Sequence, residues 1–177
     1  MTDDDAFSPG PLAEVSGRPD GDAWVLTLRR ELPFPRTQVW TLLTVPEELA
    51  RWAPYTADRD LSVTGPATLT MIDGGTRQEL PADVRRADGP EVLEHTWGQD
   101  VLRWTLAETG GGTRLELSQT VVSHEWMAQV AAGWHLCLDV AASVLAGTPV
   151  APIVGEDAMN HGWADLRDAY AQRLAGR

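Results

Sequence analysis

Three polar side chains stand where they could orient a ligand or transfer a proton. His95 lies between Leu93 and Trp97 in an alternating segment, and an imidazole can act as general acid or base near neutral pH. Gln119 is a second polar residue in an apolar alternation, and Tyr55 follows a Pro-containing turn. The alternatives are a core histidine that a neighbour or a water satisfies, and a tyrosine on a surface turn.

The remaining reactive residues do not form a recognisable site. His135 and Asp139 are four residues apart on a predicted helix, but two ligands do not make a metal site and no HExxH spacing is present. Cys137 lies within the same apolar helix, where an inert buried thiol is expected, and no GxSxG motif exists. The sequence therefore predicts no metal and no cofactor.

Composition narrows the class of partner. The chain has 177 residues with 26 acidic and 14 basic side chains, which gives a net charge of −12. This negative net charge repels phosphate backbones and anionic lipids, so we expect neither a nucleic acid nor a membrane surface as partner. The eight Trp residues, against two Phe and two Tyr, indicate a fold that uses large flat side chains. A single Cys137 is typical of a cytoplasmic protein, and a homodimer is compatible with the sequence.

The two ends of the chain and one apolar run bear on organisation. Residues 1–22 are rich in Asp, Pro and Gly, which predicts a flexible acidic N-terminal tail, although residues 12–15 could pair as a short edge strand. Residues 23–177 are expected to form a single domain. The acidic start lacks the basic flank of a signal peptide, and His135 and Asp139 interrupt the apolar run 130–147, so no membrane span is expected.

The elements that must position the polar residues follow from periodicity. A strand is predicted at 24–32, followed by two short helices at 37–43 and 46–52. A long apolar helix is predicted from residue 124 to Gly147, and a last one at 156–174. Between them the period is two, and turn residues separate six predicted strands at 60–63, 67–72, 79–86, 91–97, 101–108 and 113–122. The predicted fold class is α+β with an antiparallel sheet.

This order of elements resembles the helix-grip fold of the START-like (SRPBCC) superfamily. Residues 39–52 (VWTLLTVPEELARW) are similar to the "VWxALTdPexLxxW" segment of bacterial proteins related to the activator of heat-shock-protein ATPase. Residues 94–97 (EHTW), residues 112–117 (GTRLEL) and the pair Gly133-Trp134 match further segments of that family. The resemblance implies a curved sheet wrapped around one long C-terminal helix, with a cavity between them.

Strand alternation and this fold together indicate which side chains face the interior. We expect them to line one Trp-rich cavity that binds a ligand, although plain core packing is the alternative at each position. The predicted ligand-binding residues are Trp52, Tyr55, Leu69, Met71, His95, Trp97, Trp104, Leu117, Gln119, Trp134 and Leu138.

The predicted function is binding of a small hydrophobic molecule, aromatic or polycyclic, that His95 and Gln119 would orient. A first alternative is a cyclase or hydratase-type enzyme in which His95 is the acid–base group. A second is a protein-interaction module, as the co-chaperones of the family imply. Whether any reaction is catalysed stays open at this point.

Overall fold

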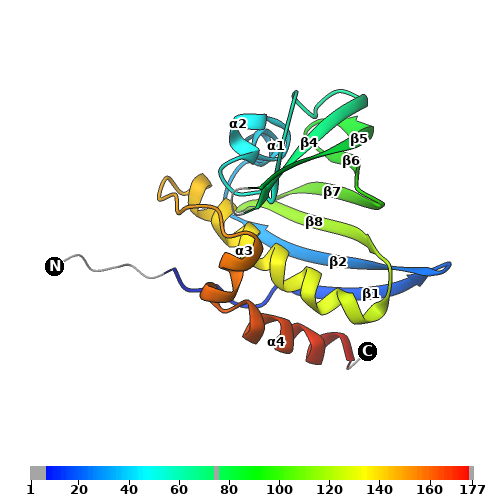
Figure 1. Cartoon of the computed structure of the whole chain (residues 1–177). Coiled ribbons are helices and arrows are strands. Elements are labelled where there is room, and N and C mark those ends of the chain that lie inside the picture. The colour runs from blue at the N-terminus through cyan, green and yellow to red at the C-terminus, as the bar shows by residue number, and fades with distance from the viewer. Residues whose placement is uncertain (1–6, 74–75, 176–177) are drawn as a thin grey trace.

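A single antiparallel sheet of eight strands curves around one long helix (Figure 1). The computed structural model describes residues 7–73 and 76–175. The strand order is β1-β2-β8-β7-β6-β5-β4-β3, so the hairpin β1–β2 joins the sheet beside β8, the last strand along the chain. This is the predicted α+β helix-grip arrangement, and the structure confirms it.

The strands are β1 Glu14–Asp20, β2 Ala23–Leu32, β3 Tyr55–Ala57, β4 Gly65–Asp73, β5 Thr76–Asp88, β6 Val92–Trp97, β7 Asp100–Thr109 and β8 Gly112–Val121. The α-helices are α1 Arg36–Thr44, α2 Pro46–Leu49, α3 Met127–Leu145 and α4 Trp163–Ala175, and two 3-10 helices, η1 His124–Trp126 and η2 Gly155–His161, precede α3 and α4. The predicted turn at 73–75 lies largely outside the described residues.

The N-terminal segment is ordered from well before residue 22, contrary to the predicted tail. Residues 14–20 pair with β2 along their whole length, from Glu14 opposite Arg29 to Asp20 opposite Ala23. The backbone N–H of Ala13 also donates to the Tyr170 hydroxyl at 2.9 Å. The alternative of an edge strand is therefore nearer to the structure, although β1 begins later and extends further than 12–15. Residues 1–6 lie outside the described part of the chain.

The predicted strand at 60–63 is wrong. The Arg59 guanidinium donates to the carbonyl oxygens of Asp60, Val63, Gly65 and Pro66, and these bonds hold the segment as a turn. The sheet edge is instead the short strand β3, which pairs with β4. An arginine that satisfies four backbone carbonyls removes the need for a ladder partner, and strand propensity does not report such a contact.

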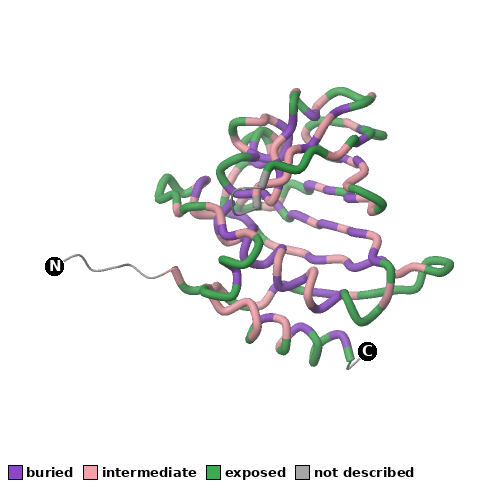
Figure 2. Tube along the Cα trace, viewed as in Figure 1, coloured by how far each residue is buried: buried purple, intermediate pink, exposed green. Residues whose placement is uncertain are grey.

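Buried and less buried residues alternate along the central strands as predicted (Figure 2). In β7, Trp104 is 1% exposed whereas Arg103 faces solvent. Leu102 and Leu106 share the inward face with Trp104. The register on which the inward set was chosen is therefore confirmed, because a slip of one residue would have exposed all three side chains.

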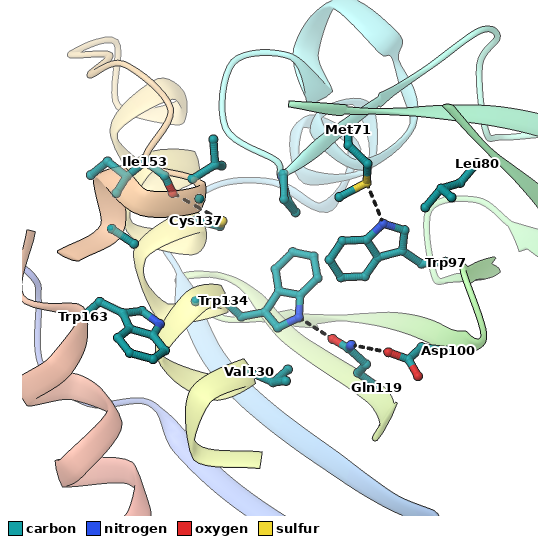
Figure 3. Close-up of a pocket in the computed structure, with 15 residues that line it drawn as sticks. Met71, Leu80, Trp97, Asp100, Gln119, Val130, Trp134, Cys137, Ile153 and Trp163 are labelled. Carbon is teal, nitrogen blue, oxygen red and sulfur yellow. Dashed lines mark hydrogen bonds between the residues drawn. The ribbon is translucent and has the colours of Figure 1, made fainter. Parts of the chain in front are cut away.

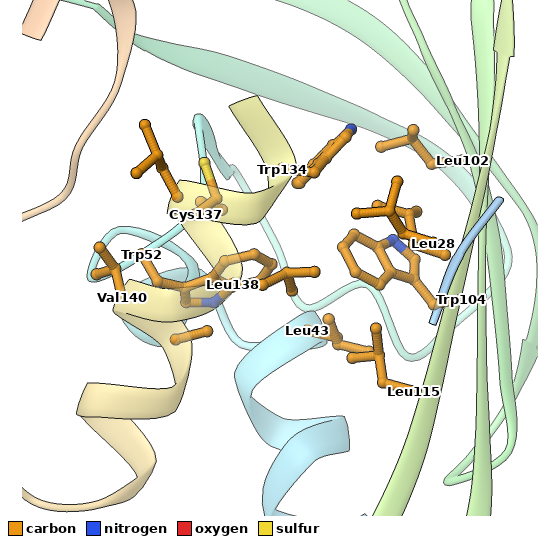
Figure 4. Close-up of a cluster of buried hydrophobic side chains, with 14 of the residues drawn as sticks. Leu28, Leu43, Trp52, Leu102, Trp104, Leu115, Trp134, Cys137, Leu138 and Val140 are labelled. Carbon is orange, nitrogen blue, oxygen red and sulfur yellow. The ribbon is translucent and has the colours of Figure 1, made fainter. Parts of the chain in front are cut away.

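The long helix α3 packs its apolar side into the curve of the sheet (Figure 4). Trp134 meets Trp104 edge-on, with ring centroids 5.4 Å apart, and Trp52 lies 6.5 Å from Trp134. The Trp52 indole N–H donates to the Leu42 carbonyl at 2.9 Å, so α1 helps to fix this ring. Large apolar rings from helix and sheet thus share one core.

The combined stretch of η1 and α3, His124–Leu145, is long and apolar enough by length and composition to cross a membrane, contrary to the sequence argument. More than half of its most apolar window is buried inside the protein. Packing against the sheet accounts for that apolar character, as in the core helix of many proteins.

The closing segment divides into two elements rather than forming one helix. The 3-10 helix η2 ends at His161, and the following Gly162 has a φ of +85°, in the left-handed region that favours glycine. The chain then turns into α4, which packs beside α3 and near β1. This break places η2 and the start of α4 over the open end of the space between α3 and the sheet.

Candidate ligand-binding cavity

A cavity of about 460 Å³ lies between the sheet, α3 and the segment that follows α3 (Figure 3). Its sheet wall includes Met71 of β4, Leu80 of β5, Trp97 of β6 and Gln119 of β8. Pockets for small organic molecules have volumes of roughly 300–1,000 Å³. The cavity is therefore large enough for one such molecule.

The helix wall consists of four residues at one helical spacing. Val130, Gly133, Trp134 and Cys137 are related by three, four and seven positions, so they lie on one face of α3. A Cβ atom placed on Gly133 would meet nothing within 4 Å. The helix thus presents bare backbone to the cavity next to the large Trp134 ring.

The outer wall comes from the segment after α3. Ile153, Val154 and Ala158 line the cavity together with Trp163 at the start of α4. The Cys137 thiol lies 4.0 Å from the Ile153 carbonyl oxygen, and burial raises the pKa of this thiol to about 12. The Cys137 thiol is accordingly buried and protonated rather than nucleophilic, as the sequence predicted, and it forms part of the apolar wall.

One hydrogen-bonded chain of polar groups crosses the otherwise apolar lining. The Trp134 indole N–H donates to Gln119 Oε1 at 2.6 Å, and Gln119 Nε2 donates to Asp100 Oδ2 at 2.9 Å. Burial raises the pKa of the Asp100 carboxyl, and the bond from Gln119 only partly offsets this. The amide of Gln119 therefore connects an indole to a carboxyl group that is poorly solvated.

Two indoles form the centre of the cavity wall. The Trp97 and Trp134 ring centroids are 5.7 Å apart with the planes inclined at 62°. The Trp97 indole N–H points to the Met71 sulfur at 3.2 Å, and the Tyr55 ring packs against the Trp97 ring with a centroid distance of 5.5 Å. Both rings are held by neighbours, so the surface that they contribute to the cavity wall is apolar and preorganised.

Of the eleven side chains predicted to bind a ligand, the structure brings four to the cavity: Met71, Trp97, Gln119 and Trp134. The other seven lie in the core that surrounds it, each at most 1% exposed: Trp52, Tyr55, Leu69, His95, Trp104, Leu117 and Leu138. Strand parity put all of them on the inward face, but it does not tell which inward positions are covered by other side chains.

His95 has two polar neighbours in the core. Its Nδ1 lies 3.0 Å from the Thr96 carbonyl oxygen, which assigns the ring proton to Nδ1. Nε2 is then free to accept the Tyr55 hydroxyl proton at 3.3 Å. Burial lowers the pKa of His95 and raises that of Tyr55, so both groups are neutral. This arrangement matches the core-histidine alternative.

His135 and Asp139 belong to a second polar cluster on the other side of α3. Asp139 accepts from Arg30 Nη1 at 2.5 Å and from the Gly10 backbone N–H at 2.9 Å. His135 Nδ1 lies 2.7 Å from the Tyr170 hydroxyl, and its Nε2 lies 3.1 Å from Asp139 without the alignment of a hydrogen bond. The pair thus ties α3 to β2, α4 and the N-terminal segment.

This cluster keeps Asp139 ionised despite its burial. Desolvation acts to raise the pKa of Asp139, but the His135 ring, the Arg30 charge and the Gly10 N–H together outweigh it and lower the pKa. In residues 7–73 and 76–175, no group of three or more His, Cys, Asp or Glu side chains is arranged to hold a metal ion.

Sequence reasoning missed two residues that matter most for the cavity. Asp100 was assigned to a turn, yet it is the first residue of β7 and has the same parity as Leu102 and Trp104. Extending the alternation back by two residues would have placed it inward. Gly133 is one position before Trp134, and its spacing from Val130 would have placed it on the cavity face of the helix.

Comparison with known proteins identifies the family of the chain. The profile of the family described as "Activator of Hsp90 ATPase homolog 1-like protein" matches residues 33–146, which is more than half of the chain. The chain belongs to this family. As a member of it, the chain has the START-like fold predicted from its sequence, in a class that commonly binds hydrophobic ligands. No protein with curated annotation matches it significantly in sequence.

Solved structures extend the likeness beyond the family segment. EF2215 from Enterococcus faecalis, a conserved protein of unknown function, superposes with a TM-score of 0.70 at 14% identity, over 92% of this chain and 91% of its own. CalU16 from Micromonospora echinospora gives a TM-score of 0.67 at 21% identity, over 90% and 95%. A protein encoded by BPP1335 of Bordetella parapertussis gives 0.66 at 23% identity, over 98% and 96%. At these identities the likeness concerns the fold.

Proposed function

We propose that this family member binds a small hydrophobic molecule, flat and aromatic or polycyclic, in the cavity between α3 and the sheet. The observation that carries the proposal is the pair of indoles, Trp97 and Trp134, fixed 5.7 Å apart in the wall of a 460 Å³ apolar cavity. Indole faces offer large apolar contact area at little entropic cost, because their rings are already held.

Gln119 and Asp100 supply the polar contacts that would fix the orientation of the ligand. Both border the cavity, and Gln119 is held by bonds on either side. His95 lies outside the lining and is satisfied by Tyr55 and Thr96, so the proposal assigns it no contact with the ligand. The proposed role is to bind this molecule in the cytoplasm, for transport or for sensing. The proposal includes no reaction at His95.

The test uses acridine, a neutral tricyclic dye at slightly alkaline pH, titrated while indole emission is recorded. Acridine should quench part of the emission with saturation at one molecule per chain. Gly133→Leu is the blocking variant, because its side chain would enter open space without a backbone clash. We expect this variant to fold as the parent does and to lose binding by at least tenfold. Equal binding by both proteins would overturn the proposal.

Native mass spectrometry of protein purified from its own host gives the natural ligand. A single co-purifying small organic species, absent from the Gly133→Leu variant prepared in the same way, would identify it. A parent protein that carries no species and binds no acridine would contradict the proposal.

A further inference from the structure

The described residues that line the cavity include one carboxylate and no basic side chain. Of the described residues that line it, only Asp100 and Cys137 can ionise, and the Cys137 thiol stays protonated because its pKa is raised to about 12. Asp100 Oδ2 accepts the Gln119 amide, and no Arg or His in the described part of the chain lies within ion-pair distance of either carboxylate oxygen. This acid therefore faces the cavity without a counter-ion of its own.

We propose that the cavity selects a flat aromatic ligand that carries a positive charge, whose cationic nitrogen pairs with the Asp100 carboxylate. The inference rests on the proposed function and specifies the chemical class of its ligand. An amine, amidine or ring nitrogen that is protonated at neutral pH meets this requirement, whereas a carboxylate, sulfate or phosphate ester does not.

The argument from desolvation favours a cation over a neutral molecule. A ligand that fills the cavity removes water from Asp100, which is already partly buried and forms no ion pair with a described residue. Covering an unpaired carboxylate is costly, and a charge-assisted hydrogen bond from the ligand offsets that cost. Binding of a purely apolar ligand would require protonation of Asp100, or it would leave the carboxyl group outside the contact.

The indoles and the overall charge act in the same direction. Trp97 and Trp134 present aromatic rings beside Asp100, and such rings attract cations through their quadrupole. The net charge of −12 raises the local concentration of cations near an open cavity and lowers that of anions. Nothing in the described lining would stabilise a negative ligand group at the same place.

The test compares three tricyclic probes of one shape, 9-aminoacridine, acridine and acridine-9-carboxylate, at slightly alkaline pH, where they are cationic, neutral and anionic. The parent protein should bind the cation roughly tenfold more tightly than the neutral probe, and the anion most weakly. Asp100→Asn keeps an oxygen that can accept the Gln119 amide and removes the charge. It should lose about tenfold in affinity for the cation while acridine changes little.

Two further variants make the result specific. Asp22→Asn removes the same charge from an exposed turn between β1 and β2, so it should leave the affinity for all three probes unchanged. Asp100→Glu keeps the charge and should keep the preference for the cation. Thermal melting of each variant checks that the fold is retained.

The outcomes separate the two proposals. If the parent binds all three probes equally, or if Asp100→Asn and Asp22→Asn weaken the cation alike, the cationic class is overturned. Binding of acridine that Gly133→Leu abolishes would then still support the cavity. If no probe binds the parent, both proposals are overturned together.

Discussion

Neighbouring residues of α3 lead to two polar regions of opposite character. Trp134 lines the cavity and begins a chain of groups that ends at Asp100, a carboxyl group with no charged partner among residues 7–73 and 76–175. His135 points to the other side, where Asp139 accepts hydrogen bonds from Arg30 and from the Gly10 N–H. His135 itself contacts the Tyr170 hydroxyl. The first region borders the cavity, where its carboxyl group can contact a ligand. The second is closed by the protein itself.

The difference shows how a buried polar group that stabilises the fold can be told from one that is available to a ligand. In the Asp139 cluster the pKa of the carboxyl is lowered, which means that the fold stabilises the charge. At Asp100 the pKa is raised, which means that the fold leaves the charge poorly solvated. A carboxylate whose charge the protein does not compensate, at the wall of a cavity, is a candidate for contact with a ligand.

The largest expected effect is on the closed region. Asp139→Ala should lower the free energy of unfolding by about 3–4 kcal/mol, because it leaves the partly buried Arg30 guanidinium without its partner and also removes the acceptor of the Gly10 N–H. Urea denaturation measures this loss, and acridine affinity of the folded fraction should stay that of the parent. A loss below about 1 kcal/mol would mean that the cluster is solvated and not closed.

Trp134→Ala should cost about 3 kcal/mol, within the range for removing a buried Trp, since the ring is 3% exposed and packs against Trp104. In contrast to Asp139→Ala, it should also abolish acridine binding. Urea denaturation and dye titration on the same samples separate the two effects. An unchanged dye affinity would show that the probe binds elsewhere.

Gly133→Ala should raise the free energy of unfolding by about 0.5–1 kcal/mol, the gain from replacing a helix-interior glycine. The new methyl group meets nothing within 4 Å, so no packing strain opposes the gain. The melting temperature measures it. A lower melting temperature than that of the parent would mean that this side of α3 is packed and that the cavity is filled.

The smallest effects concern pH, and they have opposite signs in the two regions. The lowered pKa of Asp139 means that stability is lost as pH falls below the ordinary value of 3.8, since the unfolded chain then binds more protons. The raised pKa of Asp100 means that stability is lost as pH rises from 3.8 through the folded-state value. Asp139→Asn should therefore flatten the plot of urea midpoint against pH below 3.8, and Asp100→Asn should flatten it above 3.8. Flattening on the same side would contradict the contrast.

The fold could be predicted from the sequence because periodicity and turn residues carry it. The alternation in β7 and β8 and the apolar stripe of α3 each specify which face is inward, and the structure agrees. Two elements at the sheet edges could not be predicted. Strand β1 depends on pairing with β2 and on the hydrogen bond that the preceding Ala13 N–H donates to the Tyr170 hydroxyl, and the turn at Arg59 depends on one guanidinium. Both are tertiary contacts that local propensity does not contain.

The candidate site was predictable only as an inward face. Parity identified Trp97, Gln119 and Trp134, which line the cavity, but it equally selected Trp104 and His95, which other side chains cover. Whether an inward side chain borders space depends on packing volume, which a linear pattern does not encode.

The central claim, that a ligand occupies the cavity and contacts its two indoles, is tested most directly by the indole N–H signals of the eight Trp residues in a two-dimensional nitrogen–proton NMR spectrum. Titration with acridine should shift the Trp97 and Trp134 signals most, with Trp163 next, because these three line the cavity. The signals of Trp24, Trp40 and Trp126, which lie away from it, should stay in place. Shifts confined to those three, or a spectrum that saturating acridine leaves unchanged, would contradict the account.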